Sequence, residues 1–338
     1  MNFGAKLGAI YRRDRHISRL ILMMVAWAVF MAITRFDKFY TLINFQTMAS
    51  QFPEFGLMAL GIMVCMITGG IDLSTVGVAN LTSILMAMLM KSMVDAEGEM
   101  SAAVIALAFV IAIALGALAG ALNGLLVSKI RIPPILATLG MSELFTGIAI
   151  VVTNGKAVSK LPRIYASSIN SKIFGLIPTQ LVFFAAMAVI IWFLLSRTTF
   201  GTKIYMIGTS STAARFSGVK TDLLLVKTYL ISGICAALGG MIMLANYNSA
   251  RADYGTVYTL QCVLIVVLGG VNPNGGSGKI SGVVLATCLL KLLETGLNRF
   301  PQISSYYISL IWGGVLILIM VLNYFTEKNI RIFRSRRA

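Results

Sequence analysis

The sequence predicts an all-α protein, a polytopic membrane bundle of about ten transmembrane helices, some of them short or broken. Of its 338 residues, 58% are hydrophobic and only 12% are charged, whereas soluble proteins average about 25% charged residues. Apolar stretches recur along the whole chain and are separated by short polar loops. Many of these stretches approach the roughly 20 residues that a helix needs to cross a hydrocarbon core. Lipid is therefore the solvent for most of this chain.

The apolar stretches define ten expected spans. Several are shorter than a full crossing, which is compatible with helices that are broken or flanked by long basic side chains. The spans are predicted at residues 18–34, 53–68, 75–91, 102–128, 134–153, 178–196, 227–248, 256–271, 281–295 and 305–323.

Basic residues set the expected orientation. They concentrate before the first span, between the sixth and seventh spans, and after the last one, and cytoplasmic segments carry the excess of Lys and Arg. An even number of spans then places both termini in the cytoplasm. The predicted organisation is a basic cytoplasmic segment at 1–17, a transmembrane domain at 18–323 with a cytoplasmic loop at 197–226, and a basic cytoplasmic tail at 324–338.

One loop disagrees with this orientation. The acidic loop that contains Asp95, Glu97 and Glu99 falls outside the membrane, as expected. The segment 156–172, which carries four basic residues, falls on the same external side. The two termini and the 197–226 loop are the richest basic segments, so the orientation is kept.

Several function classes are unlikely from composition. The net charge of +16 resides mainly in loops and tails, unlike the basic stripes of nucleic-acid readers, so no nucleic-acid partner is expected. The four cysteines lack CxxC spacing, and His16 is the only histidine, so neither a His-based zinc site nor a Ser-His-Asp triad is available. The run 275–281 is not a Walker A motif, because Pro273, just before it, stands where the motif requires Gly, and Ile280 stands where it requires Ser or Thr. We expect no metal, no cofactor and no enzymatic activity in this chain.

Two glycine-rich breaks interrupt apolar helices, at Thr68–Ser74 and at 268–278. Backbone can leave a helix at membrane depth only where protein or a water-filled cavity satisfies its polar groups. Paired breaks of this kind are typical of a transport pathway. Such breaks would also be apt in a stand-alone secondary transporter driven by an ion gradient.

The cytoplasmic segment 203–220 places small residues between basic ones in an ordered pattern: Gly208, then Ala213-Ala214-Arg215, then Ser217-Gly218-Val219. It is similar to the coupling segment of ribose-type permeases of ABC importers. Further matches follow in the family's order at 68–74, 132–140, 153–155, 249–255 and 268–278. The chain departs from the family at Ser210, where many relatives have Asn, and directly after Ser74.

The resemblance implies a permease subunit of a bacterial inner-membrane ABC importer that takes up a small sugar or sugar-like solute. Its implied partners are cytoplasmic ATPase subunits, a second permease (a copy or a paralogue), and a periplasmic or other extracytoplasmic solute-binding protein. Relatives also transport autoinducer-2 or nucleosides. The residues expected to couple to the ATPase are Gly208, Ala213, Ala214, Arg215 and Gly218.

The candidate pathway residues are polar groups within the apolar spans. Asp72 and Ser74 either face the pathway or cap the helix that follows them. Glu143 either faces the pathway or pairs with a neighbouring helix. The remaining candidates are amides that either hydrogen-bond sugar hydroxyls or hold helices together: Asn80, Asn123, Asn246 and Gln261.

Overall fold

The computed structural model describes residues 15–93 and 101–302, together with a few single positions between 307 and 321. The predicted final span at 305–323 lies largely outside the described residues. Residues 1–14, the acidic loop that contains Asp95, and the basic tail at 324–338 lie wholly outside them.

The described residues are almost entirely helical, which confirms the predicted all-α class. The four strands contain two residues each and form two small antiparallel pairs, β1 with β4 and β2 with β3. The elements are α2 (Arg15–Thr34), α3 (Phe36–Phe39), α4 (Leu42–Ile67), α5 (Thr75–Ser92), α6 (Ala102–Ser128), α7 (Pro134–Thr153), β1 (Val158–Ser159), α8 (Arg163–Ile169), β2 (Lys172–Ile173), β3 (Ile177–Pro178), α9 (Thr179–Arg197), α10 (Thr199–Thr209), α11 (Ser211–Phe216), α12 (Thr221–Tyr247), β4 (Ser249–Ala250), α13 (Tyr258–Leu268) and α14 (Ile280–Leu297).

Eight of the described helices are long and apolar enough to cross a membrane: α2, α4, α5, α6, α7, α9, α12 and α14. The shorter apolar helix α13 occupies the predicted eighth span. Helices α6 and α7 match the predicted spans at both ends, whereas α4 begins eleven residues before the predicted position, at Leu42 rather than 53. In the sequence, the polar residues between 44 and 51 and the internal Pro53 are typical of a loop rather than of the first half of a helix. Membrane helices nevertheless tolerate proline when neighbouring groups satisfy the carbonyl that it leaves unpaired.

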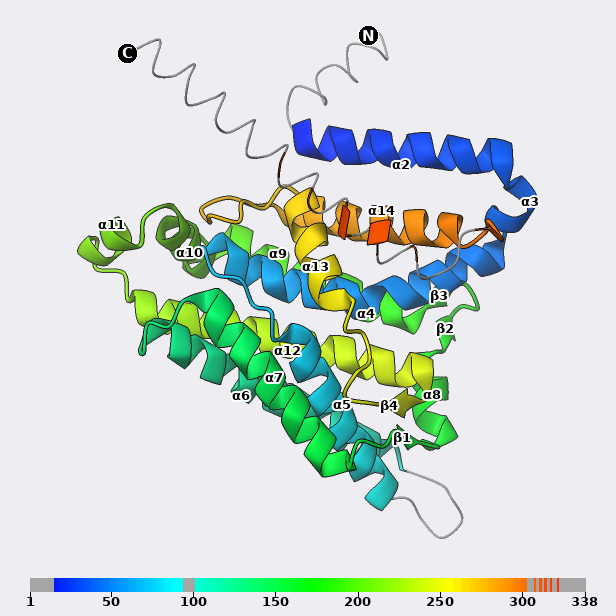
Figure 1. Ribbon diagram of the computed structural model, residues 1–338, viewed down its shortest axis with the longest axis horizontal. Coiled ribbons are helices and arrows are strands. Elements are labelled where there is room, and N and C mark those ends of the chain that lie inside the picture. Colours follow the sequence, from blue (N-terminus) through cyan, green and yellow to red (C-terminus); the bar gives the residue numbers. More distant parts are fainter. Residues whose placement is uncertain are drawn as a thin grey trace.

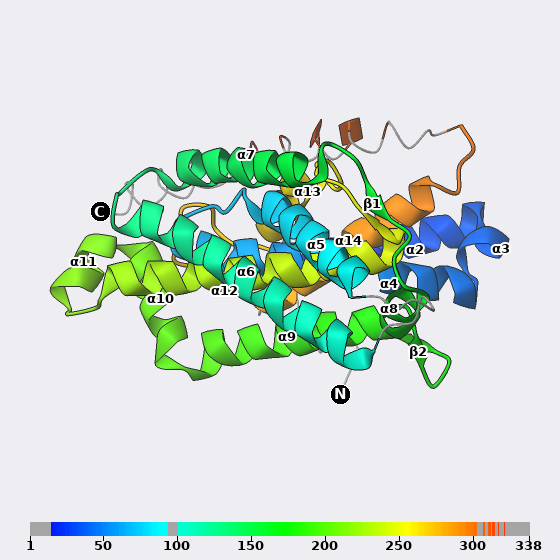
Figure 2. The same cartoon turned by 90° about the horizontal axis from the view of Figure 1, so that it is seen from below.

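Helices α4 and α12 form the centre of the bundle (Figure 1). Both are buried over most of their length, whereas most side chains of α2, α6, α7 and α9 are half-buried or exposed. Helix α12 packs against α4, α5 and α6, and α7 packs mainly on α5. Figure 2 shows α7 and α9 on opposite sides of this central pair. The exposed apolar faces of the outer helices are suited to lipid or to another membrane subunit.

The contact between α6 and α12 depends on glycines that let the two backbones approach closely. Gly116, Gly120 and Gly124 recur every fourth residue on α6 and face α12, where Gly233 contacts Gly116. A Cβ atom added at Gly120 would overlap the Tyr229 carbonyl oxygen of α12. Small residues at such spacing drive helix association in lipid through close packing.

Replacing Gly120 by alanine is therefore expected to push α6 away from α12. The added methyl meets backbone rather than a movable side chain, so the expected destabilisation is about 1–3 kcal/mol. Thermal unfolding of the purified chain should show a lower midpoint than wild type. Gly147→Ala is the matched control, because a Cβ atom at Gly147 meets nothing within 4 Å. Equal midpoints for the two variants would contradict the packing argument.

The predicted external loop 156–172 is an ordered cap at one end of the bundle. Strand β1 pairs with β4, with Val158 opposite Ala250. Within α8, the Tyr165 hydroxyl donates a 2.6 Å hydrogen bond to the Met241 carbonyl of α12. Lys91 at the end of α5 donates to the Ser159 carbonyl at 3.0 Å. The α10–α11 segment lies at the opposite end of the bundle (Figure 1).

Candidate functional site

The break between α4 and α5 is held by a small buried polar cluster. Gly69 has φ +84°, a left-handed conformation that ends α4. The Asp72 Oδ1 atom accepts hydrogen bonds from the Ser74 amide at 3.0 Å and from the Ser74 hydroxyl at 2.7 Å. Asn123 of α6 donates its side-chain amide to Ser74 Oγ at 2.6 Å. Three of the predicted pathway residues thus lie together, in a hydrogen-bonded turn that directly precedes α5.

Because of this turn, two substitutions of Asp72 are expected to differ in their effect on the stability of the chain. Asp72→Leu removes the acceptor and leaves the buried Ser74 amide unpaired, which is expected to destabilise the chain by about 1–3 kcal/mol. Asp72→Asn keeps an oxygen that accepts the same bonds and should retain most of the stability. The thermal unfolding midpoints of the purified variants measure this difference. Similar losses for both variants would show that the charge, rather than the hydrogen bonds, matters at this position.

The second break, between α13 and α14, contacts the first. Asn272 Oδ1 accepts a hydrogen bond from the Asn274 amide at 3.0 Å, a two-residue turn like the one that Asp72 makes. The Gly276 amide donates to the Ile67 carbonyl at the end of α4, at 2.8 Å. Gly208 of α10 packs against both segments, with no room for a Cβ atom. The two breaks and the predicted coupling segment therefore meet at a single junction.

The predicted coupling segment consists of two short helices, α10 and α11. Ser210 caps α11, because its hydroxyl accepts a hydrogen bond from the Ala213 amide at 3.2 Å. Ser and Asn serve equally well at this position, which gives a physical reason for the departure from the family pattern. After α11, Gly218 adopts φ +76° and turns the chain toward α12.

The five predicted coupling residues fall into two groups in the structure. Gly208 and Ala214 face the protein, and Ala214 is buried beside Ile207 and Leu224. Ala213, Arg215 and Gly218 are exposed. Arg215 lies 3.4 Å from Asp222 of α12, although more than half of its side chain stays exposed. Next to these, the Phe216 side chain is 89% exposed at the end of α11.

A polar pocket of about 540 Å³ lies at the opposite end of the bundle. One face of α4 lines it through Ile43, Thr47, Ser50 and Glu54, residues that lie three or four positions apart. The other walls come from the 170–180 segment, the end of α12, the start of α13 and the end of α14: Asn170, Lys172, Pro178, Gln180, Asn246, Tyr247, Tyr258, Lys291 and Glu294, with Gln46 and Gln51 of α4.

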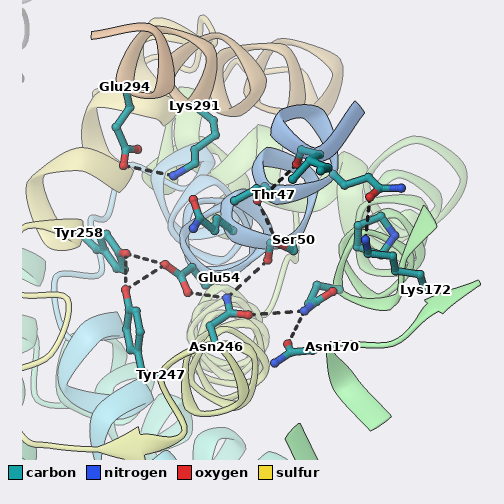
Figure 3. Close-up of a pocket in the computed structure, with 15 residues that line it drawn as sticks. Thr47, Ser50, Glu54, Asn170, Lys172, Asn246, Tyr247, Tyr258, Lys291 and Glu294 are labelled. Carbon is teal, nitrogen blue, oxygen red and sulfur yellow. Dashed lines mark hydrogen bonds and ion pairs between the residues drawn. The ribbon is translucent and has the colours of Figure 1, made fainter. Parts of the chain in front are cut away.

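Glu54 organises the floor of this pocket (Figure 3). Its carboxylate accepts hydrogen bonds from the Tyr258 hydroxyl at 2.5 Å, the Asn246 side-chain amide at 3.0 Å and the Tyr247 hydroxyl at 3.3 Å. The side chain is 3% exposed. Lys291 forms an ion pair with Glu294 at 3.1 Å. The buried charges in this pocket therefore have polar partners, as burial requires.

The predicted pathway residues do not form one continuous line. Asn246 lines the pocket, and Asn80 donates to the Ala252 and Tyr254 carbonyls, both at 2.8 Å. Gln261 is buried, and its side-chain nitrogen has no partner among the described residues. Glu143 lies on an exposed face of α7. Their roles in transport stay predictions.

The residues that sequence reasoning missed are Glu54 and Lys291. Both are charged side chains within apolar helices, and that alone marks a functional candidate in a membrane protein. In the sequence, Glu54 lies at the edge of the span that is expected to begin at 53, so it does not stand out as a charge inside the membrane. The two tyrosines that bind Glu54 carry no sequence signal, because Tyr is common near membrane interfaces.

Comparison with known proteins gives consistent matches over most of the chain. Residues 44–320 match the family model described as branched-chain amino acid transport system / permease component. The ribose import permease protein RbsC of Escherichia coli K12 is 32% identical over 311 residues, which cover 90% of this chain and 91% of that protein. RbsC of Bacillus subtilis is 34% identical over 281 residues, or 83% and 84% of the two chains.

A further relative is named for a different solute. The autoinducer 2 import system permease protein LsrD of Yersinia pseudotuberculosis is 31% identical over 281 residues, which are 80% of each chain. No solved structure matches this chain significantly.

Proposed function

This chain belongs to the branched-chain amino acid transport system / permease component family of ABC permeases, and from this premise we propose that it translocates a small sugar across the bacterial inner membrane. It is a multi-pass membrane protein and not itself a catalytic subunit. ATP hydrolysis then takes place in a partner chain, and the permease supplies the path. The observation that carries the proposal is the 32% identity to a ribose permease over 90% of the chain.

The α10–α11 segment is the proposed contact with the ATPase. An exposed aromatic side chain beside an arginine is the composition that anchors protein interfaces, and Phe216 and Arg215 supply this pair. The junction with Ile67 and Gly276 connects this segment directly to both helix breaks. Movement of α11 with the ATPase would therefore reach the broken helices without an intervening loop.

This assignment sets the orientation that we propose. We propose that the end that bears α10 and α11 is cytoplasmic and, as the charge pattern of the sequence predicts, that both termini lie in the cytoplasm. Lys129, Arg197, Lys203 and Arg215 all belong to this end, in agreement with the excess of basic residues on cytoplasmic segments. The cap formed by α8 and the strands faces the periplasm, where a solute-binding protein would dock.

Glu143 supports a second permease subunit beside α7. It is the tenth residue of this twenty-residue helix and is exposed in the single chain. A carboxylate facing lipid at the centre of the bilayer costs several kcal/mol. We therefore assign this face of α7 to a polar path shared with a second permease, either a copy of this chain or a paralogue.

Ribose-like sugars are the proposed substrates, because a ribose permease is similar to 90% of this chain. Autoinducer 2 is the second candidate, supported by the similarity to LsrD. The test is uptake of radiolabelled sugar by proteoliposomes that contain the permease, its partner ATPase and its solute-binding protein. Uptake should require ATP and all three components. Uptake by this chain alone without ATP would overturn the proposal in favour of an ion-coupled transporter.

A further inference from the structure

The polar pocket reaches deep into the bundle. Glu54 at its floor lies twelve residues along α4 from Leu42, which corresponds to a depth of about 18 Å at 1.5 Å per residue. The polar face of α4 continues from Glu54 to the mouth of the pocket through Ser50 and Thr47. Polar side chains at this depth in a membrane protein line a cavity that holds water or a solute.

The charges inside the pocket are already compensated. Neutral donors surround the Glu54 carboxylate, Lys291 pairs with Glu294, and Lys172 donates to Gln46 Oε1 at 2.6 Å. An ionic ligand of either sign would meet charges of both signs, because Glu54 and Glu294 are acidic whereas Lys172 and Lys291 are basic. The arrangement therefore favours an uncharged ligand.

One buried group still lacks a partner. Gln180, which is 1% exposed, donates through Nε2 to Asn170 Oδ1 at 2.5 Å. Its Oε1 atom has no hydrogen-bond partner among the described residues. A buried acceptor left unpaired is costly, and a hydroxyl group would satisfy it. The rings of Tyr247 and Tyr258 line the same pocket and offer apolar faces.

We propose that this pocket binds a neutral, polyhydroxylated solute within a single permease subunit, with Gln180 accepting a hydrogen bond from a hydroxyl. A volume of about 540 Å³ falls in the range of small-molecule sites, about 300–1,000 Å³. Hydroxyls match the mixture of acceptors and donors on the walls, and the C–H faces of a sugar match the tyrosine rings. This site rests on the proposed transport function.

Saturation-transfer NMR on the full chain in lipid nanodiscs tests the site, with D-ribose, D-galactose and D-xylose as probes. Wild type should give a signal with at least one probe. Gln180→Leu, which removes the free acceptor, and Thr47→Trp, which fills the mouth from an exposed position, should each weaken binding at least tenfold. Thr287→Val is the matched control, because Thr287 is buried in α14 outside the pocket and bonds to its own helix.

Each outcome decides the question. Loss of signal in both pocket variants with retention in the control supports the site. If Gln180→Leu does not fold, Thr47→Trp alone decides. No signal in wild type, or equal signals in wild type and Thr47→Trp, overturns the site. If the reconstituted importer takes up sugar but no NMR signal is seen, the transport function stands and the pocket proposal fails. If sugar binds but ATP-dependent uptake is absent, the pocket stands and the transport function fails.

Discussion

Replacing Gly208 by valine is expected to abolish transport and to lower the stability of the chain itself. A side chain at this position overlaps the Ile67 carbonyl oxygen on one side and the Gly276 amide on the other. These two atoms form the hydrogen bond that joins the helix breaks, so neither can move away without breaking the junction. Overpacking against backbone costs about 3 kcal/mol or more, and the unfolding midpoint should fall by at least about 5 °C.

Ala213→Val separates this packing effect from an effect on partner binding. Ala213 lies in the same segment but is exposed, so the unfolding midpoint of the Ala213→Val variant should stay near that of wild type. Sugar uptake by the reconstituted importer and thermal unfolding of the isolated permease are measured for both variants. A stable Gly208→Val chain that has lost only ATPase coupling would mean that Gly208 faces the partner rather than the two breaks.

Replacing Phe216 by aspartate should release the ATPase from the permease without unfolding it. The side chain is 89% exposed and contributes little to the packing of this chain. An aromatic residue at the centre of an interface typically contributes about 2 kcal/mol or more to binding, equivalent to an affinity loss of about thirtyfold. Co-purification with the ATPase and sugar-stimulated ATP hydrolysis should both fall.

Phe174→Asp is the matched control for this prediction. Phe174 is 92% exposed at the opposite end of the bundle, in the turn between β2 and β3. Its φ of +53° is one that aspartate accepts more readily than phenylalanine. The Phe174 variant should bind the ATPase as wild type does. Equal ATPase binding by the Phe216 and Phe174 variants would remove α11 from the proposed interface.

Secondary structure and membrane residence were predictable because each depends on local properties of the chain. Hydropathy over about twenty residues decides whether a segment crosses lipid, and α6 and α7 accordingly coincide with the predicted spans. The glycine-rich break is also a local feature, so the sequence predicted that Asp72 and Ser74 lie at it. The early start of α4 could not be predicted from the sequence, because a helix half that is rich in polar residues is stable only when other segments cover it.

The pocket and the junction depend instead on residues that are far apart in the chain. The hydrogen-bonded pairs are Glu54 with Tyr258, Gln46 with Lys172, and Ile67 with Gly276. None of these pairs leaves a periodic pattern, since each arises from helix packing rather than from helix period. The predicted coupling glycine shows the same limit: the need for a small residue at Gly208 was visible, but the neighbours that require it were not.

The sequence by itself therefore determined that this protein is a bundle of membrane helices interrupted at two glycine-rich breaks, because composition, helix period and caps act locally. Only the tertiary structure decided that the breaks meet at Gly208 and that α4 carries a polar groove down to Glu54. The junction results from the close backbone approach of α4, α10 and the second break, and the groove from hydrogen bonds of α4 with α12 and α13, so both depend on residues that are distant in the chain.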